Sequence, residues 1–428
     1  MAVLPEPSPK PSAELAAALI RTGFFDTYFL YEHGEVWTVA WGVRVEIVVD
    51  ATHVRVRRDS VEESWPVVGG PVRAARAALE RLSLPEWTVC GWIAFEAVHV
   101  MNDRSDLAGD SEVVHLVVPE VEVRIESGRA SVVRGGDARL GALLEHLRTA
   151  PVEDAPASGR ATVPVDLDLD AGGGRYRDAV LEAVEEIRST ELRKVTLSRS
   201  VPVDEPVDFV ETYLAGRAAT APERSFLLSI GGLTTTGFCP QTVLEAGSDG
   251  KVVMRPRLET RADELVPDPD EAHEHAIAVE CAFAGLTEVC EPGSVVVEEP
   301  LADTAPGGVH DLASRLCGRL AEGKTSWDAL ELLFPGATIS GAPREAACEF
   351  ISGAEAAPRG VYSGAVLFAS DDGFLDAGLV LCAVYERKGR RWLRAGAGIV
   401  ASSRPERELR ETCAKLRSMS AHLVAGTA

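Results

Sequence analysis

Alternating apolar and polar residues dominate the region from Phe25 to Val133 and predict a strand-rich first third of the chain. Clear examples of this period-two pattern are Val43 to Val49 and Val113 to Val123, which is the spacing of half-buried strands. Between these runs, the Ala, Arg and Leu content of Pro71 to Leu82 favours a helix. The proline-rich segment 1–13 is expected to be a disordered leader, because it has no apolar periodicity.

The remainder of the chain mixes helical periodicity with short apolar runs. A linker-like loop is expected at 151–165, where Pro, Ala and polar residues accumulate. Strands are predicted at Lys194–Val203, Phe226–Ile230, Val252–Met254, Gly364–Phe368, Leu379–Tyr385 and Trp392–Ala395. Helices are predicted at Tyr176–Glu191, Pro269–Cys290, His310–Leu320, Ser326–Leu333, Pro343–Ile351 and Pro405–Leu423. The last of these is expected to begin at a Ser402–Ser403 cap, with Pro405 in its first turn. This order predicts an α+β fold with large antiparallel sheets, as one domain over 14–428 with a strand-rich part (14–150) and a catalytic part (166–428).

Composition narrows the classes of partner. The 428 residues carry 43 basic and 66 acidic side chains, a formal net charge of −23, which disfavours binding to nucleic acid or to anionic membranes. No apolar run approaches the ~18 residues that span a bilayer, and the eight cysteines form no C-x-x-C pair. We expect a cytoplasmic protein, a monomer or weak homodimer, whose partner is a small-molecule carboxylate.

Two pairs of glutamates are the first candidates for chemistry. Glu271 and Glu274 lie three residues apart in one predicted helix, and Glu408 and Glu411 have the same spacing in the last one, so each pair shares a helix face. Four carboxylates suit Mg²⁺, which prefers oxygen ligands and leaves room for water and substrate. The alternative is that both pairs are solvated faces, with Glu411 and Lys415 forming an ordinary i,i+4 ion pair.

Several motifs together resemble the chorismate-utilising enzyme family, and most of all its salicylate synthase branch. They are Gly91–Glu96, Arg193–Arg199, Glu271 with Glu274–Ala276, Cys290–Ser294, Ser340–Arg344, Tyr362–Ala365, Ala395–Val400 and Glu408–Lys415. The resemblance covers essentially the whole chain. It implies the fold of anthranilate synthase component I, with two large sheets, helices outside them and the active site between them.

The resemblance also implies roles for individual residues. Lys194 corresponds to the lysine that activates water, and Glu271, Glu274, Glu408 and Glu411 correspond to the Mg²⁺ ligands. Substrate contacts are implied for Thr260, Arg261, Ser340, Arg344, Tyr362 and Gly398. Salicylate synthases form isochorismate and then eliminate pyruvate in a pericyclic step, which needs orientation more than acid or base.

The chain departs from the family pattern where the substrate is recognised. The family's Ser-Pro-Glu acid motif ends here in Gln241, and an amide cannot supply a proton, a contribution typically worth ~10²–10⁴-fold. Glu259 replaces a glycine, and its charge about 4 Å from a substrate carboxylate would cost ~4 kcal/mol at an effective dielectric of about 20. Cys382 replaces a substrate-binding arginine, at a cost of ~1.5–3 kcal/mol.

Two further departures are less severe. Asp311 stands where the family has a histidine, while Ser314 is kept. Arg344 replaces a lysine, which preserves the charge but changes its geometry. We therefore predict an Mg²⁺-dependent lyase or isomerase of specialised metabolism that acts on a cyclic or enol-ether carboxylate. The alternatives are a working salicylate or isochorismate synthase and a non-catalytic binding or scaffold relative.

Overall fold

The computed structural model describes residues 11–109, 111–149, 167–238, 241–259, 269–298, 301–304 and 310–426. Within them the strands form two large sheets and one small sheet, and every strand pairing found there is antiparallel. The predicted α+β fold class is confirmed. No helix in these ranges is long and apolar enough to cross a membrane.

The first large sheet contains ten strands, and it presents Lys194 near one edge. Their spatial order is β20 (Gly341–Ala342), β10 (Lys194–Pro202), β24 (Arg390–Ile399), β23 (Cys382–Arg387), β12 (Leu233–Phe238), β11 (Arg224–Ile230), β1 (Tyr28–His33), β2 (Val36–Trp41), β8 (Val121–Glu126) and β9 (Arg129–Arg134). Register is fixed around β10, where Lys194 lies opposite Ala342 and Thr196 lies opposite Gly398.

The second large sheet contains eleven strands. Their order is β16 (Val296–Val297), β19 (Leu316–Arg319), β14 (Lys251–Arg255), β13 (Thr242–Ala246), β22 (Leu375–Leu379), β21 (Ala365–Ser370), β6 (Thr88–Ile93), β7 (Val114–Val118), β3 (Val45–Val49), β4 (His53–Arg58) and β5 (Val61–Pro66). The small sheet has the order β15 (Arg257–Glu259), β18 (His310–Ala313) and β17 (Leu301–Thr304).

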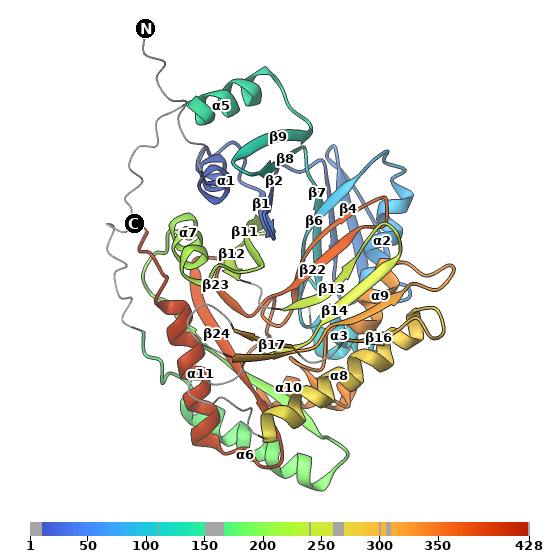
Figure 1. Cartoon of the computed structure of the whole chain (residues 1–428), viewed down its shortest axis with the longest axis vertical. Coiled ribbons are helices and arrows are strands. Elements are labelled where there is room, and N and C mark those ends of the chain that lie inside the picture. Colours follow the sequence, from blue (N-terminus) through green and yellow to red (C-terminus); the bar gives the residue numbers. More distant parts are fainter. Residues whose placement is uncertain are drawn as a thin grey trace.

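Helices cover the outer faces of the two sheets, as Figure 1 shows. The helices of the described residues are α1 (Ser12–Arg21), α2 (Pro71–Arg81), α3 (Ala97–Met101), α4 (Ser105–Ala108), α5 (Ala138–Thr149), α6 (Gly173–Ser189), α7 (Phe209–Thr220), α8 (Pro269–Val289), α9 (Ser326–Leu333), α10 (Arg344–Ala354) and α11 (Pro405–Ser420). α1, α7 and α11 pack on the first sheet through a shared apolar core. α2, α8 and α9 pack on the second sheet through another.

A third apolar core fills the space between the sheets. It contains Phe29, Phe226 and Tyr385 from the first sheet and Trp92 and Val366 from the second. These residues alternate with others that face the outer helices, because successive side chains of a strand point to opposite faces. Central strands such as β6 and β7 are therefore buried on both faces, whereas the edge strands β5 and β9 are largely exposed.

Three local expectations need correction. The helix predicted at His310–Leu320 is wrong, since that segment forms β18 and β19, whose pairing with β15, β17, β14 and β16 outweighs its helical spacing. The predicted Ser402–Ser403 cap of α11 is also wrong. Arg404 precedes the helix with no side-chain cap, and the Ser403 hydroxyl instead accepts a hydrogen bond from the Val400 N–H at 3.1 Å.

The predicted leader ends earlier than expected, because α1 begins at Ser12 and buries Ala13. Residues 1–10 of that leader and the whole predicted linker at 151–165 lie outside the described residues. The sequence patterns did not predict the helices α5 and α7.

Candidate active site

Lys194 is the buried centre of the candidate site. It begins β10, and its side chain is 1% exposed. The Nζ atom donates to the carbonyls of Ala337 at 3.2 Å and Thr338 at 3.3 Å, and it forms an ion pair with Glu274 Oε1 at 2.8 Å. Three acceptors match the three N–H groups of an ammonium, so each Nζ proton can have a partner.

Glu274 reaches Lys194 from α8 by crossing over Gly398 of β24. A Cβ atom added to Gly398 would lie 2.2 Å from Glu274 Oε1, closer than any non-bonded contact allows. The glycine therefore leaves the space in which the carboxylate lies. The structure thus brings together three of the predicted residues, Lys194, Glu274 and Gly398.

Glu408 and Glu411 approach the same place from α11, which packs against β24. Glu408 is buried. Burial raises the pKa of its carboxyl to about 7, and the negative charges of Glu411 and Glu274 act in the same direction. Glu411 pairs with Lys415 at 2.8 Å, the i,i+4 contact that was the alternative interpretation. The electrostatic coupling places carboxylates from both helices in one region.

The donor chemistry of this region fits a hard divalent cation, because carboxylate oxygens are the ligands that Mg²⁺ takes. Among the side chains that the structure describes, no group of three or more Asp, Glu, His or Cys is arranged to hold a metal ion. Glu274 is turned toward Lys194 instead. α8 includes Glu271 in its first turn, but the described side chains do not include that of Glu271. The metal assignment stays a prediction.

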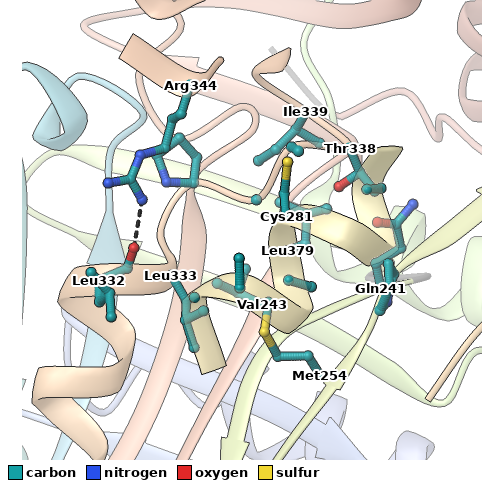
Figure 2. Close-up of a pocket in the computed structure, with 18 of the residues that line it drawn as sticks. Gln241, Val243, Met254, Cys281, Leu332, Leu333, Thr338, Ile339, Arg344 and Leu379 are labelled. Carbon is teal, nitrogen blue, oxygen red and sulfur yellow. Dashed lines mark hydrogen bonds between the residues drawn. The ribbon is translucent and has the colours of Figure 1, made fainter. Parts of the chain in front are cut away.

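Gln241 precedes β13 and is anchored on one side. Its Nε2 donates to the Arg257 carbonyl at 2.6 Å, and its main-chain carbonyl accepts from the Leu379 N–H at 3.0 Å. Its Oε1 makes no hydrogen bond to the described residues. The Gln241 side chain lines a cavity of about 320 Å³, and Arg344 lines the same cavity, well separated from Gln241 (Figure 2).

Glu259 and Asp311 are directly opposite each other in the small sheet, where β15 pairs with β18. The described side chains include neither of them. Thr260 and Arg261 lie outside the described residues. The roles of all four stay predictions.

Four predicted substrate contacts have other partners in the structure. The Ser340 hydroxyl donates to the Gly336 carbonyl at 3.0 Å. Arg344 Nη1 donates to the carbonyls of Leu332 and Phe334. Tyr362 is buried, 5.7 Å from the Arg394 guanidinium. Cys382 packs against the apolar core beneath α1, α7 and α11.

One buried charge network was missed in the sequence. The carboxylate of Glu355 accepts hydrogen bonds from the Ser198 N–H at 2.7 Å, from Arg359 Nη2 at 2.6 Å and from Arg394 Nη2. Burial raises the pKa of Glu355, but the charges of Arg359 and Arg394 together with the donated hydrogen bonds outweigh burial and leave the pKa below its ordinary value. Only the i,i+4 spacing of Glu355 and Arg359 was visible in the sequence. The network fixes β10 and β24 beneath Tyr362.

His275 follows Glu274 in the chain, and its side chain contacts Ser314. Its Nε2 lies 2.8 Å from the Ser314 hydroxyl, so the residue that the family keeps at position 314 holds α8 to the start of β19. Burial lowers the pKa of His275, and the positive charge of Lys194 lowers it further. The ring is therefore neutral near pH 7.

Comparison with known proteins agrees with this geometry. The family described as chorismate binding enzyme matches residues 26–421. A salicylate synthase of Mycolicibacterium paratuberculosis is 38% identical over 97% of this chain and 93% of its own length. An anthranilate synthase component 1 of Streptomyces coelicolor is 31% identical, over 83% of this chain and 77% of the relative.

Solved structures show the same fold. Anthranilate synthase component I of Streptococcus pneumoniae superposes with a TM-score of 0.74 at 21% identity, covering 90% of this chain and 92% of that one. The menaquinone-specific isochorismate synthase of Escherichia coli superposes with a TM-score of 0.67 at 19% identity, covering 96% and 90%. The match across residues 26–421 and the 38% identity over nearly the full length show that this chain belongs to the chorismate binding enzyme family.

Proposed function

We propose that the protein is a salicylate synthase-like lyase or isomerase that eliminates from, or rearranges, a cyclic or enol-ether carboxylate related to chorismate. The observation that carries this proposal is the buried Lys194–Glu274 pair, 2.8 Å apart and lying beside Gly398. A buried lysine with a movable counter-ion is a candidate base, because its charge state depends on whether the carboxylate stays.

The chain's own residues control the proton on Lys194. With Glu274 and two carbonyls as acceptors, the protonated form of Lys194 is stabilised. Lys194 cannot act as a base in that form, because its nitrogen already carries the proton. When Glu274 moves away, the buried cation loses its opposite charge, so deprotonation costs less. Glu274 therefore acts as the group that sets the charge of Lys194.

The carboxylates of Glu271, Glu274, Glu408 and Glu411 would hold Mg²⁺, which when bound supplies positive charge to a substrate carboxylate. The raised pKa of Glu408, about 7, is caused first by burial and then by the charge of Glu411, and it supports this role because a bound cation would favour the ionised carboxyl. Lys415 partly compensates Glu411.

Gln241 restricts the reaction. An amide donates and accepts hydrogen bonds but does not release a proton at neutral pH, so loss of a ring hydroxyl would receive no acid from this position. Elimination of pyruvate from an enol ether by an internal hydrogen transfer needs no such acid and relies on the substrate being held in one conformation. The anchored Gln241 amide suits that orienting role.

The second candidate is a working salicylate synthase that converts chorismate through isochorismate to salicylate and pyruvate. The 38% identity to a salicylate synthase over 97% of the chain favours it. The substitutions at Gln241, Glu259 and Cys382 argue against it. A cytoplasmic setting and a role in specialised metabolism belong to either candidate.

Calorimetric titration with Mg²⁺ tests whether the carboxylates form a metal site, which a pure scaffold has no reason to keep. We expect binding that Glu274→Ala and Glu411→Ala each weaken by more than the ~10–100-fold typical of losing an outer-shell partner. Glu406→Ala is the matched control, since Glu406 lies on the same helix with its side chain 71% exposed. Equal Mg²⁺ affinity in all three variants would contradict the assignment.

A further inference from the structure

The cavity that Gln241 lines is a space that the proposed function leaves without a role. We call it the α8 cavity. It lies between α8, the end of α9 and segment 335–341, and its volume is about 320 Å³. Its walls include Val243, Met254, Cys281, Leu333, Ile339 and Leu379 (Figure 2).

The cavity starts where the Lys194 site ends. Ala278, Cys281, Gly285 and Glu288 line it, and they follow Glu274 at intervals of four and three residues, so they share its helix face. Ala337 and Thr338, whose carbonyls accept hydrogen bonds from Lys194, also line the cavity. One face of α8 thus carries Glu274, which pairs with Lys194, and in its following turns the same face forms a wall of the cavity.

Small side chains on α8 keep this space open. Ala278, Ala282 and Gly285 present little volume, and a Cβ atom added to Gly285 would lie 2.6 Å from Leu333 Cδ2. An apolar cavity of about 150 Å³ is enough to hold benzene, so about 320 Å³ accommodates a ring with a further short group. From Ala278 to Glu288 the helix advances about 15 Å, so the α8 wall of the cavity is longer than a single ring.

Polar groups with unused capacity line the cavity beside the apolar walls. Arg344 uses Nη1 on the Leu332 and Phe334 carbonyls, while its Nε and Nη2 make no hydrogen bond to the described residues. Gln241 Oε1 is similarly open. Glu288 is exposed to solvent, where its charge is screened. The walls therefore suit an apolar body that ends in an anion at Arg344.

We propose that the α8 cavity is a specificity pocket for an apolar, carboxylate-ended substituent of the substrate, which makes that substrate larger than chorismate. The proposal rests on the proposed function, because it places the reacting ring at Lys194 and Gln241. It assigns Arg344 to the substituent rather than to the ring carboxylate. Cys281 then lies against the bound group.

Biphenyl-4-carboxylate is a suitable probe, and its neutral carboxamide is the matched control. We expect the full chain to bind the carboxylate at least tenfold more tightly than the amide in calorimetry. Arg344→Gln should remove that preference, and Arg344→Lys should retain part of it. Cys281→Phe should abolish binding by filling the cavity, with thermal melting as the check that the variant folds.

A second readout needs no substitution. The bound probe should protect Cys281 from alkylation by iodoacetamide, followed by peptide mass, while Cys317, which does not line the cavity, keeps its reactivity. Absence of protection together with equal affinity of Arg344→Gln overturns the cavity proposal. Glu274→Ala separates the two proposals: it should abolish Mg²⁺ binding and leave probe binding unchanged. Probe binding that is lost in Glu274→Ala and kept in Arg344→Gln places the ligand at Lys194, which also overturns the cavity assignment.

Discussion

Gly396 and Gly398 lie two residues apart on β24, and a methyl group added at each meets a different obstacle. At Gly398 the obstacle is the carboxylate of Glu274, the far end of a flexible side chain. At Gly396 it is the main-chain carbonyl of Leu197, which would lie 2.7 Å from the new Cβ. The first can move, whereas the second belongs to the paired strand β10.

We therefore predict that Gly398→Ala changes function and not folding. The added methyl would occupy the space in which the Glu274 carboxylate lies and should keep that carboxylate from both Lys194 and the proposed metal site, so Mg²⁺ affinity should fall about as far as in Glu274→Ala. The free energy of unfolding should change by less than ~1 kcal/mol, since the colliding group can rotate away. Calorimetry and urea denaturation measure the two effects separately.

Gly396→Ala is the control on the same strand. Here the added methyl forces the strand pair apart, which should cost about 1–3 kcal/mol of unfolding free energy. If Gly398→Ala proves as destabilising as Gly396→Ala, Glu274 is held rigidly and cannot be the movable counter-ion of Lys194.

At the scale of elements, Glu331 joins two helices on the second sheet. It lies on α9, and its Oε2 accepts hydrogen bonds from the Val72 N–H at 2.8 Å and the Arg73 N–H at 3.1 Å, in the first turn of α2. Gly70 precedes that helix, and a Cβ atom there would lie 1.7 Å from Glu331 Oε1. The α2 helix, which has no capping side chain of its own, is thus capped by its neighbour.

Burial raises the pKa of Glu331 from 4.5 to about 7. Between these values the folded protein keeps a proton that the unfolded chain has lost, so stability falls as pH rises through this window. The penalty is complete above pH 7 and amounts to roughly 3 kcal/mol at most. Glu331→Gln removes the titration and keeps an acceptor for the two N–H groups.

Urea denaturation at pH 5 and pH 8 checks this prediction. The loss of stability between the two pH values should be smaller in Glu331→Gln than in the unsubstituted protein by roughly 3 kcal/mol at most. Glu80→Gln, at an exposed position of α2, should match the unsubstituted protein. Parallel pH dependence in Glu331→Gln would show that the carboxyl already titrates normally.

Among the elements, those with long periodic patterns were predicted well. α8, α9 and α11 begin at the predicted residues, because their apolar stripes and first-turn residues are local features. β18 and β19 were mistaken for a helix, since each has only four residues and is defined by pairing with strands distant in sequence. Local pattern cannot show such pairing.

At the scale of the whole molecule, family motifs identified the fold and the residues around Lys194. The contacts that shape the site could not be read from the sequence, because they come from segments far apart. The carbonyls of Ala337 and Thr338 reach Lys194 from segment 335–341, the Glu355 network joins β10, β24 and Arg359, and the α8 cavity forms where α8 meets α9 and segment 335–341. The pairing of Lys194 with Glu274 was likewise visible only in three dimensions.

We propose that altered substrate recognition, and not loss of the base or the metal carboxylates, determines what this enzyme acts on. On this proposal, Glu259 and Cys382 would together oppose chorismate by ~5–7 kcal/mol if their effects add, about four to five decades in affinity. Neighbouring sites rarely add fully, so this sum is an upper guide. Restoring the acid alone should therefore be insufficient.

The most direct measurement is turnover of chorismate with Mg²⁺, followed by chromatography for isochorismate and by fluorescence for salicylate. The unsubstituted protein and Gln241→Glu should give no product above background. The triple variant Gln241→Glu, Glu259→Gly, Cys382→Arg should form isochorismate in a reaction that depends on Mg²⁺. Salicylate formation by the unsubstituted protein at a rate equal to that of the triple variant would show that its substrate pocket still accepts chorismate and that recognition is not altered.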